Sequence, residues 1–466
     1  MYFTLEGILG TPLSVSATFI FLFLLFGAFL EKTGVGAYFN DLALSVAGKR
    51  IGGPAKVAVF SSALQGTISG SSVANVVTSG SFTIPMMRRL GYRREFAGAV
   101  EAASSTGGQI MPPIMGAAAF LMAEFTGVPY WEIAKAAAIP AILYFAGIWI
   151  MVHFEAKRIG LRGLTDEEMP DKKEVWKKSY LLLPIIAIIT FLMLGVSPVR
   201  AALYGIISTI VVGAFRKETR MSFGDILRAL ENGARAALGV AAATACAGMI
   251  VGVVTLTGVG LKFANGLLNF AGGIVLLTLF FTMLSSIILG MGTPTTANYI
   301  ITSTIAAPAI IALGAPVLSA HMFTFYFGIV ADITPPVALA AFAASGIAGG
   351  SPMKTGVNST KLAIAAFIIP YIFVLSPEIL LIDSTFLEAS FVVFTATIGM
   401  IGVSAGLIGY WLAPLYWWER IWCAAAGLLL IIPGWVTDTA GLGSLALIFA
   451  LQVIRSRKDK PSVGTT

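Results

Sequence analysis

The stretch "GMGTPTTANYIITSTIAAP", residues 290–308, places hydroxyls, a carboxamide, glycines and prolines in the middle of a strongly apolar chain. Of the 466 residues, 57% are hydrophobic and only 11% are charged, a composition far from that of soluble domains. Long apolar segments without the period-two alternation of a β-barrel are typical of membrane-spanning helices; they include 14–30, 139–154, 180–196 and 389–414. The sequence therefore predicts an all-α polytopic membrane protein.

The formal net charge of +7 comes from Lys and Arg that gather in short clusters between the apolar segments. Such clusters are orientation signals in membrane proteins, and this interpretation is preferred to a nucleic-acid surface. Cys246 and Cys423 lie in apolar segments and have no metal-ligand spacing. The sequence contains neither a phosphate-binding loop nor a Ser/His/Asp set at one membrane depth, so we expect neither an enzyme nor a cofactor.

A long-range repeat runs through the chain. A shift of 223 residues aligns "ANVVTSGSFTIPMMRRLG" (74–91) with "ANYIITSTIAAPAIIALG" (297–314), so that Asn75 falls on Asn298. The same shift aligns "IMPPIMGAA" (110–118) with "ITPPVALAA" (333–341), double proline on double proline. Farther upstream, a shift of 224 aligns "TGVG" at 33–36 with "TGVG" at 257–260. Shared order and spacing over nearly a hundred residues indicate two copies of one unit.

Charge predicts that the two copies are inverted relative to each other. The stretch "RRLGYRRE" (88–95) is strongly basic, whereas the aligned stretch 311–320 carries no charged residue. The positive-inside rule places the first in the cytoplasm and the second outside, and it also places the basic stretches 155–178, 216–235 and 455–460 in the cytoplasm. The C-terminus is therefore expected to be cytoplasmic. Met1 is then expected outside, which suggests spans missing upstream or supplied by a partner.

Each copy is expected to hold a re-entrant hairpin followed by a broken span. The hairpin arms, 54–69 with 74–88 and 274–289 with 295–312, are too short to span comfortably. The expected broken spans, 96–124 and 321–347, carry the double prolines in their middle. Proline removes a backbone donor and disfavours helix in the preceding residue, which frees carbonyls at mid-membrane. Such backbone is tolerated where it is buried or lines a polar cavity.

The polar groups at these tips and breaks suit two kinds of ligand. Hydroxyl, amide and carboxylate oxygens, together with freed carbonyls, suit a cation such as Na⁺, and helix N-termini suit a carboxylate. The alternative for single Gly, Ser or Thr residues is close helix packing. For Asp332, the alternative is a structural carboxylate that accepts helix N–H groups. Asparagine and a double proline recurring in the same order favour a functional site.

Four motifs carry a resemblance to a known family: "SGSSVANVVTSGSFTIPMM", "EAASSTGGQIMPPIMGAAAF", "GMGTPTTANYIITSTIAAP" and "GIVADITPPVALAAFAASGIAG". Over roughly residues 12–376 the chain resembles the large permease subunit of the tripartite ATP-independent periplasmic transporters, fused-permease type. The resemblance implies an elevator-type importer of a small organic acid in a bacterial or archaeal inner membrane. It also implies Na⁺ as coupling ion, an extracytoplasmic substrate-binding protein and a small membrane subunit.

The resemblance also implies site residues. One cation site would use Ser72, Asn75, Thr106, Gly107 and Gln109, and the other would use Thr293, Thr296, Asn298, Asp332 and Thr334. The substrate carboxylate would lie between the hairpin tips, at Ser71, Ser72, Asn75, Thr295, Thr296 and Asn298. Stretches 35–50 and 217–235 would be amphipathic arms.

The expected organisation has six parts: a scaffold span and arm (1–53), a first transport half (54–130), scaffold spans with a second arm (131–272), a second transport half (273–350), a scaffold span (351–376) and a C-terminal region of three further spans (377–466). The family's large subunit normally has scaffold spans ahead of the segment that begins here at residue 12, so we expect an N-terminally truncated or split chain. Two alternatives remain open, namely proton coupling through Asp332 and a non-transporting membrane scaffold.

Overall fold

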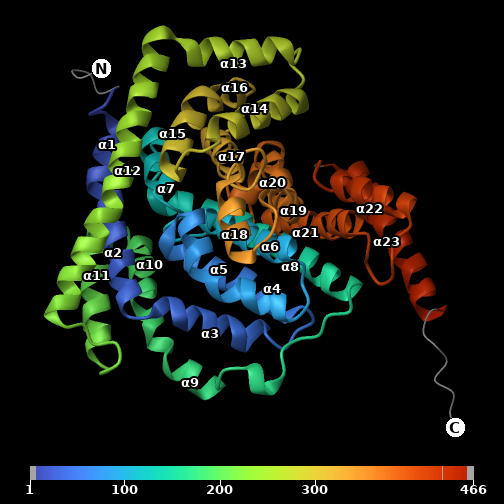
Figure 1. The fold of residues 1–466 in the computed structure, drawn as a ribbon. Helices are drawn as coiled ribbons and strands as arrows, with labels where there is room; N and C mark the ends of the chain where they lie inside the picture. The colour runs from blue at the N-terminus through green and yellow to red at the C-terminus, as the bar shows by residue number, and fades with distance from the viewer. Residues whose placement is uncertain (1–6, 433, 459–466) are drawn as a thin grey trace.

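The computed structural model describes residues 7–432 and 434–458, and regular secondary structure within them is helical (Figure 1). In that part of the chain, extended pairing is limited to an isolated bridge between Tyr410 and Pro414. Helices prevail because a helix satisfies its own backbone hydrogen bonds where lipid offers no partners.

Among the described residues, five helices are long and apolar enough to cross a membrane: Thr11–Lys32, Tyr130–Arg158, Phe223–Thr257, Phe386–Ile408 and Trp435–Ser456. Two further pairs of helices qualify when each pair is taken as one bent span, and they are Asp166–Lys177 with Ser179–Met193, bent by 67°, and Pro352–Leu362 with Ile364–Leu375, bent by 42°. These five to seven candidate spans confirm the predicted helical, multi-pass membrane protein.

The first predicted transport half begins with two helices, α4 (Gly53–Ser69) and α5 (Ser72–Arg89), that pack against each other across a two-residue joint. Gly70 in this joint has a φ of +59°, a conformation that glycine adopts without steric cost. The side chain of Ser71 accepts a hydrogen bond from the Ala74 N–H at 3.4 Å and so caps α5. The sequence thereby places a sharp polar turn between the two helices.

The broken helix of this half consists of α6 (Arg94–Gly107), a 3₁₀ turn (Gly108–Ile110) and α7 (Ala118–Thr126). Residues 111–117, which include the double proline, lie between the turn and α7. The break follows from the missing proline N–H groups and from the bias of the residue before each proline.

The second half repeats this order with α14 (Val275–Gly290), α15 (Thr295–Ile305), α17 (Val317–Val330) and α18 (Leu339–Ala348). The second double proline lies between α17 and α18. The expected arm 295–312 is divided, because α15 stops at Ile305 and a short helix, α16 (Ala307–Ile311), carries Pro308 near its start. By contrast, α5 continues through Pro85 without a break.

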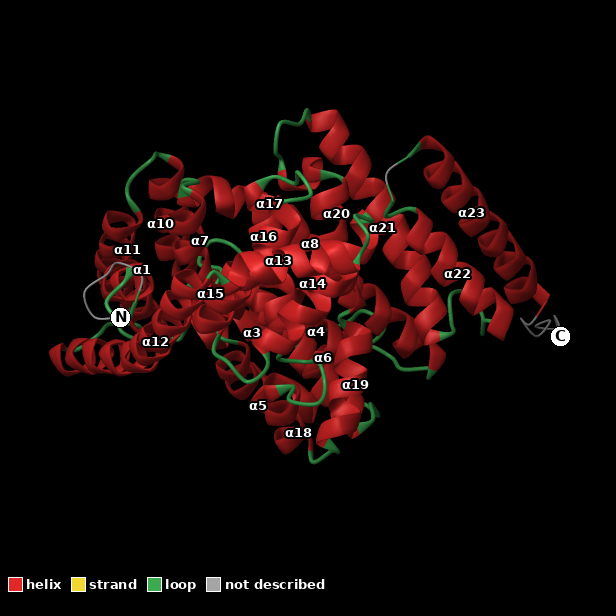
Figure 2. Ribbon diagram, turned by 90° about the horizontal axis from the view of Figure 1, so that it is seen from above, coloured by secondary structure: helices red, strands yellow, loops and turns green. Residues whose placement is uncertain are grey.

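These two groups occupy the centre of the molecule and are flanked by other helices (Figures 1 and 2). At one end α2 (Phe21–Lys32) packs against the long α12 (Phe223–Thr257) and against α11 (Pro198–Ala214), which in turn packs against α10 (Leu183–Met193) (Figure 1). α2 follows α1 (Thr11–Val15) and a π-helical turn (Ser16–Ile20). α8 (Tyr130–Arg158), α19 (Pro352–Leu362) and α20 (Ile364–Leu375) pack against the centre on the side of the C-terminal helices.

The expected amphipathic arm at 217–235 is not a separate helix. Residues 223–257 form one continuous α12, which begins with a capping box between Ser222 and Asp225 and contains no proline. The helix after the second "TGVG" is instead α13 (Val259–Phe270), which crosses the top of the view in Figure 1. α3 (Val35–Ala47), after the first "TGVG", lies toward the bottom of that view, near the short α9 (Lys172–Lys177).

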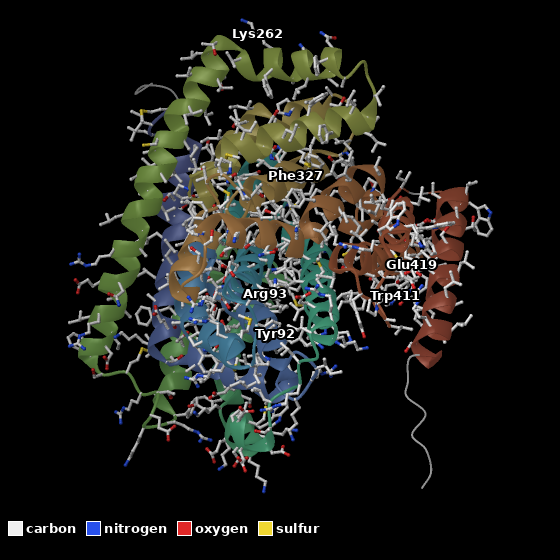
Figure 3. The ribbon with its side chains drawn as sticks, turned by 45° about the vertical axis from the view of Figure 1, so that its right-hand side comes forward. Tyr92, Arg93, Lys262, Phe327, Trp411 and Glu419 are labelled. Atoms are coloured by element: carbon white, nitrogen blue, oxygen red, sulfur yellow. The ribbon has the colours of Figure 1, made fainter. Side chains whose placement is uncertain are left out.

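The C-terminal region forms its own group of helices, α21 (Phe386–Ile408), α22 (Trp417–Leu429) and α23 (Trp435–Lys458), seen with Trp411 and Glu419 in Figure 3. Sequence analysis expects three spans here, but α22 has 13 residues and is shorter than a span. Buried Glu419 accepts hydrogen bonds from Gln452 and Arg455, and so it ties α22 to α23. The region therefore offers two helices of spanning length.

Candidate functional site

The tips and breaks of the two halves meet through a chain of hydrogen bonds. Ser72, at the start of α5, donates to Asp332 Oδ2 at 2.7 Å, and Gln109 Nε2 donates to the same oxygen at 3.2 Å. Thr295, at the start of α15, donates to Gln109 Oε1 at 2.6 Å. Gln109 and Asp332 come from the two helix breaks, and they occupy aligned positions in the repeat. Four residues predicted for the site are therefore brought into one network.

Close backbone contacts hold this meeting point together. An ideal Cβ placed on Gly116 would lie 2.9 Å from the carbonyl oxygen of Gly70 and 3.6 Å from the methyl group of Thr295. A Cβ on Gly66 would lie 2.1 Å from Cα of Gly108. Real Cβ atoms do not approach backbone so closely, so glycine is required where α4 crosses the break after α6. The first hairpin, the first break and the second hairpin converge here.

Each of the two aligned asparagines donates its side-chain amide to backbone carbonyl groups. Asn75 Nδ2 donates to the Ser62 carbonyl at 3.2 Å, while Asn298 Nδ2 donates to the carbonyls of Gly290 at 3.1 Å and Gly328 at 2.7 Å. Both side chains are buried, yet neither Oδ1 has a hydrogen-bond partner among the described residues. A buried amide oxygen without a donor costs free energy, so a ligand or water is expected beside each.

The other predicted ligands differ in whether their hydroxyl groups already form hydrogen bonds within the protein. The Thr106 hydroxyl is buried and has no partner within the described chain. Thr293 donates to the Gly290 carbonyl at 3.0 Å and Thr334 to the Val330 carbonyl at 2.8 Å, which leaves their oxygen lone pairs as acceptors. Thr296 is buried in the first turn of α15.

Gly107 is also constrained by packing. It ends α6 in a space where an added Cβ would lie 2.2 Å from the Tyr144 ring. The Tyr144 hydroxyl donates to the Ala103 carbonyl at 2.6 Å and so fixes the ring against α6. A larger side chain at residue 107 would therefore displace the ring.

A cavity of about 280 Å³ opens beside the first tip. Asn75 and Thr78 of α5 line it, with Gln65 and Ser69 of α4, while Glu31 and Asn232 face them from α2 and α12. It therefore lies between the first hairpin and the outer helices, and it gives Asn75 access to space outside its own half.

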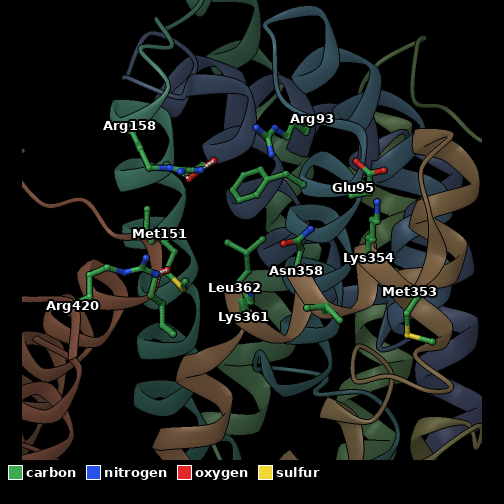
Figure 4. Close-up of a pocket in the computed structure, with 15 residues that line it drawn as sticks. Arg93, Glu95, Met151, Arg158, Met353, Lys354, Asn358, Lys361, Leu362 and Arg420 are labelled. Atoms are coloured by element: carbon green, nitrogen blue, oxygen red, sulfur yellow. Dashed lines mark hydrogen bonds and ion pairs between the residues drawn. The ribbon is translucent and has the colours of Figure 1, made fainter. Parts of the chain in front are cut away.

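A second, larger cavity of about 570 Å³ lies away from these residues and contains none of the predicted ligands (Figure 4). Cationic side chains dominate its wall, although Arg158 is paired with Glu155 at 2.7 Å. Arg420 donates to the carbonyls of Gly406 and Leu407. The lining cations are Arg93, Arg158, Lys354, Lys361 and Arg420.

Sequence analysis gave no role to Glu101, although the structure shows that it is completely buried in α6. Its carboxyl group is within hydrogen-bond distance of the hydroxyls of Ser62, Ser79, Thr83 and Ser105, which come from α4, α5 and α6. One signal was present in the sequence, namely an acid in an apolar run with serine four residues later, on the same helix face.

No group of three or more His, Cys, Asp or Glu side chains gathers at a metal-binding distance in 7–432 or 434–458. Cys246 is exposed and Cys423 is buried, and both are free thiols. The oxygens of the candidate site therefore come from hydroxyls, carboxamides, backbone and the single carboxylate of Asp332.

Comparisons with known proteins place the chain in a family. Residues 3–387 match the family described as "Tripartite ATP-independent periplasmic transporter, DctM component". The isethionate TRAP transporter permease protein DctMQ of Oleidesulfovibrio alaskensis is 22% identical over 70% of this chain and 51% of its own length. The sialic acid TRAP transporter large permease protein SiaM of Vibrio cholerae is 26% identical over 45% of this chain and 50% of its own.

The C4-dicarboxylate TRAP transporter large permease protein DctM of Pseudomonas aeruginosa is 31% identical over 29% of this chain and 31% of its own length. The chain spans about half the length, or less, of these curated relatives. The family match nevertheless covers both hairpin-like helix pairs and both helix breaks. The chain belongs to the DctM component family of the tripartite ATP-independent periplasmic transporters.

Proposed function

We propose that the chain is the large membrane subunit of a secondary active transporter that imports a small organic acid together with Na⁺. The observation that carries the proposal is the pair of buried carboxamide oxygens, Asn75 Oδ1 and Asn298 Oδ1, at aligned positions of the repeat without described hydrogen-bond donors. Two buried amide oxygens without protein donors, one in each half, suit two copies of the same small cation.

The chemistry of the first site favours a hard monovalent cation. Asn75 Oδ1 and Thr106 Oγ1 are neutral oxygens with a free lone pair, and both are shielded from water. The unwound backbone from Gly108 onward adds carbonyl oxygens at the same level of the helix. Oxygen donors without thiolate or imidazole are the ligands that alkali and alkaline-earth ions prefer.

Asp332 gives a reason for coupling between cation and substrate. Its carboxylate accepts hydrogen bonds from Ser72 and Gln109, one step from Thr295, so a negative charge lies between the starts of α5 and α15. The N–H groups of those helix starts attract a carboxylate, but Asp332 repels it. A bound Na⁺ offsets this repulsion, so the organic acid binds after the cation.

Transport itself is proposed to follow an elevator mechanism. The same order of elements, a helix pair followed by a broken helix, recurs in α4–α7 and α14–α18. The charge pattern supports opposite membrane orientations for the two groups. The central groups would carry the substrate past the flanking α2, α11, α12 and α21. The basic loops and the C-terminus would face the cytoplasm of a bacterial or archaeal inner membrane.

The partners and substrate class are part of the same proposal. The names of these relatives give isethionate, sialic acid and C4-dicarboxylates, all organic anions, as substrates of those proteins. An extracytoplasmic substrate-binding protein would deliver the acid, and a small membrane subunit would complete the scaffold around α2 and α12. No nucleic-acid partner is proposed.

The test is Na⁺-dependent thermal stabilisation of the full chain in detergent, with choline chloride at equal ionic strength as reference. A ligand that binds the folded state raises the melting temperature with its concentration. We expect a rise in Na⁺ for the native chain, and a much smaller rise for Asn75→Ala and Asn298→Ala. Asn269→Ala, which changes an exposed asparagine of α13, should respond like the native chain. Equal Na⁺ responses in all four proteins would refute the sites.

A second candidate is proton coupling through Asp332, which its burial favours because desolvation disfavours the charged carboxylate. Uptake that continues without Na⁺ and stops when the proton gradient is collapsed would support it. Uptake that requires Na⁺ would contradict it.

A further inference from the structure

The structure contains a second buried carboxyl group in the transport elements, Glu101, outside the network of Asp332. Glu101 is fully buried, and none of the ion pairs among the described residues includes it. Its neighbours are hydroxyls: Ser62 donates to Oε1 at 2.9 Å and Ser105 to the same atom at 3.0 Å. Ser79 contacts Oε1 and Thr83 contacts Oε2.

The number of protons in this cluster can be counted. A hydroxyl has one donor hydrogen and two acceptor lone pairs. Ser79 Oγ is near Glu101 Oε1 and also 2.7 Å from the Asn75 carbonyl, and Thr83 Oγ1 is near Glu101 Oε2 and 3.1 Å from the Ser79 carbonyl. Each of these two hydroxyls therefore faces two acceptors with a single hydrogen. For one of these hydroxyls, both contacts can be hydrogen bonds only if the carboxyl group is protonated and donates its own hydrogen to that hydroxyl.

Oε2 is the oxygen that fits this proton. Three hydroxyls surround Oε1, whereas Oε2 contacts the hydroxyl of Thr83 within the described chain. In the neutral state the Oε2–H group donates to Thr83 Oγ1, and Thr83 donates to the Ser79 carbonyl. On release of the proton, the bonding pair stays on Oε2 and the Thr83 hydroxyl turns to donate to it. Both charge states are then satisfied by rotation of one hydroxyl.

The cluster fits a proton better than a metal ion. The oxygens of Ser62 and Ser105 are separated from Oε1 by ordinary hydrogen-bond distances, and those of Ser79 and Thr83 approach the carboxyl still more closely. A hydrogen fills such a separation, whereas a metal ion coordinated by these oxygens would hold them farther apart.

The helices packed against α6 bring other titratable groups, and each lies elsewhere or has another partner. α4, α5, α8, α18 and α19 contact α6, and α18 has no titratable side chain. Lys56 contacts His153, and Glu155 pairs with Arg158. Among the described residues, neither these groups nor the other titratable groups on α6 and the helices that contact it form a hydrogen bond with Glu101. The other groups are Arg88, Arg89, Arg94, Glu95, Tyr130, Glu132, Lys135, Tyr144, Lys157, Lys354 and Lys361.

A hydrogen-bonded connection joins this carboxyl group to the proposed cation site. Ser62 donates to Glu101, and the Ser62 carbonyl accepts from Asn75 Nδ2. Ser79 contacts both Glu101 and the Asn75 carbonyl. Asn75 also lines the 280 Å³ cavity between the first hairpin and the outer helices. Two short routes therefore connect Glu101 with a residue at the edge of a cavity.

We infer that Glu101 is a proton-binding site of the first transport half, which takes up and releases one proton while Ser62, Ser79, Thr83 and Ser105 bond both of its charge states. The inference rests on the proposed transport function only for the role of this site in transport. In that role the site would carry a proton with α4, α5 and α6, in addition to the cation at Asn75. It assigns to this family member a titrating acid distinct from Asp332.

Infrared spectroscopy of the full chain in lipid bilayers tests the inference without a substrate. A protonated carboxyl group has a carbonyl-stretching band that a carboxylate lacks. We expect a band from Glu101 that is present at acidic pH, disappears toward alkaline pH, and is missing from Glu101→Gln at every pH. Gln has the shape of the neutral acid and cannot titrate. Glu124→Gln, which changes an exposed acid of α7, should keep the band.

Thr83→Val supplies a second measurement if Glu101→Gln does not fold. Valine preserves the shape of threonine and removes the acceptor of the Oε2–H group, so the carbonyl band should move in frequency. Identical carbonyl-stretching bands in the native chain and Glu101→Gln would mean a permanently ionised group, and a Glu101 band that persists unchanged at alkaline pH would mean a permanently protonated one. Either result overturns the inference, and neither affects the Na⁺-dependent stabilisation that tests the proposed function.

Discussion

Ser72 Oγ and Asp332 Oδ2 are 2.7 Å apart, although 260 positions separate the two residues in the chain. The hydrogen bond joins the first turn of α5 to the break between α17 and α18, and so it joins the two halves of the repeat. Gln109 donates to the same carboxylate oxygen from the other break. A single buried acid thus accepts a hydrogen bond from each of two elements of the opposite half.

Asp332→Asn should weaken Na⁺ binding while the chain still folds. Asparagine keeps the size of the side chain and an oxygen acceptor for Ser72, but it removes the negative charge. Opposite unit charges about 4 Å apart attract each other by about 1 kcal/mol in bulk water and by about 4 kcal/mol near a protein surface. We therefore expect the Na⁺ concentration for half-maximal stabilisation to rise about tenfold. The measurement is the melting temperature across a Na⁺ titration.

The matched control for this variant is Glu167→Gln, which neutralises an exposed acid in the loop after α8. Its Na⁺ titration should coincide with that of the native chain. Coincident titrations of Asp332→Asn and the native chain would show that Asp332 takes no part in cation binding.

Gly108→Ala should strongly destabilise the fold near the first helix break. The added Cβ would lie 2.6 Å from Cα of Gly66, and backbone cannot move aside as a flexible side chain can. Overpacking of this kind costs about 1–3 kcal/mol or more. A lower melting temperature in the absence of Na⁺ is the expected result.

Gly36→Ala is the control, because a Cβ on this α3 residue meets no atom within 4 Å. Alanine in an open helical position stabilises by about 0.4–1 kcal/mol through the unfolded state. If both glycine variants melt at the same temperature, the close contact between Gly66 and Gly108 is not a constraint on the folded protein.

Sequence reasoning located the tips and breaks because their signals are local. Glycine and serine at 70–72 and the prolines at 112–113 and 335–336 each act on the backbone at their own position. The alignment of Asn75 with Asn298 needed only the spacing of the repeat. Glu101 was missed because its four hydroxyl partners come from three helices, and helix packing decides which of many serines and threonines meet it.

The same distinction explains the arm expected at 217–235. The basic, amphipathic start of this stretch resembles an interfacial helix, but nothing in the local sequence ends it before the apolar residues that follow. Because no proline interrupts residues 223–257, the helix continues into the span. The charge pattern predicts which residues lie at the membrane interface, but it does not predict where a helix ends.

Glu419→Ala should loosen the C-terminal helices without affecting the Na⁺ response. Glu419 is buried and accepts from the Tyr416 N–H at 2.8 Å, from Gln452 at 3.2 Å and from Arg455 at 2.6 Å. Removing one partner of a buried pair costs about 3–5 kcal/mol, and the partial exposure of Arg455 reduces that figure to about 2 kcal/mol. Hydrogen exchange in α22 and α23 should therefore increase.

The comparison for this variant is Glu218→Ala, an exposed acid in the loop before α12. Its exchange should match that of the native chain. Unchanged exchange in α22 for Glu419→Ala would show that apolar packing against α21 alone holds this helix.

The orientation of the chain can be tested at the two ends of α12. This helix has 35 residues, a length of about 52 Å, which exceeds a hydrocarbon core of about 30 Å. Its ends must therefore reach both membrane surfaces if it crosses upright. Lys217 precedes the helix in a basic loop, and Lys262 follows it on α13, at the top of the molecule in Figure 3.

Single cysteines at these two positions, in a Cys246→Ser background, should react with a membrane-impermeant maleimide from opposite sides. The positive-inside rule places residue 217 in the cytoplasm, so intact cells should label Lys262→Cys, and inverted vesicles should label Lys217→Cys. Cys423 remains as an internal control because it is buried. Labelling of both cysteines from one side would mean that α12 does not cross the membrane, and the proposed inversion of the two halves would lose its basis.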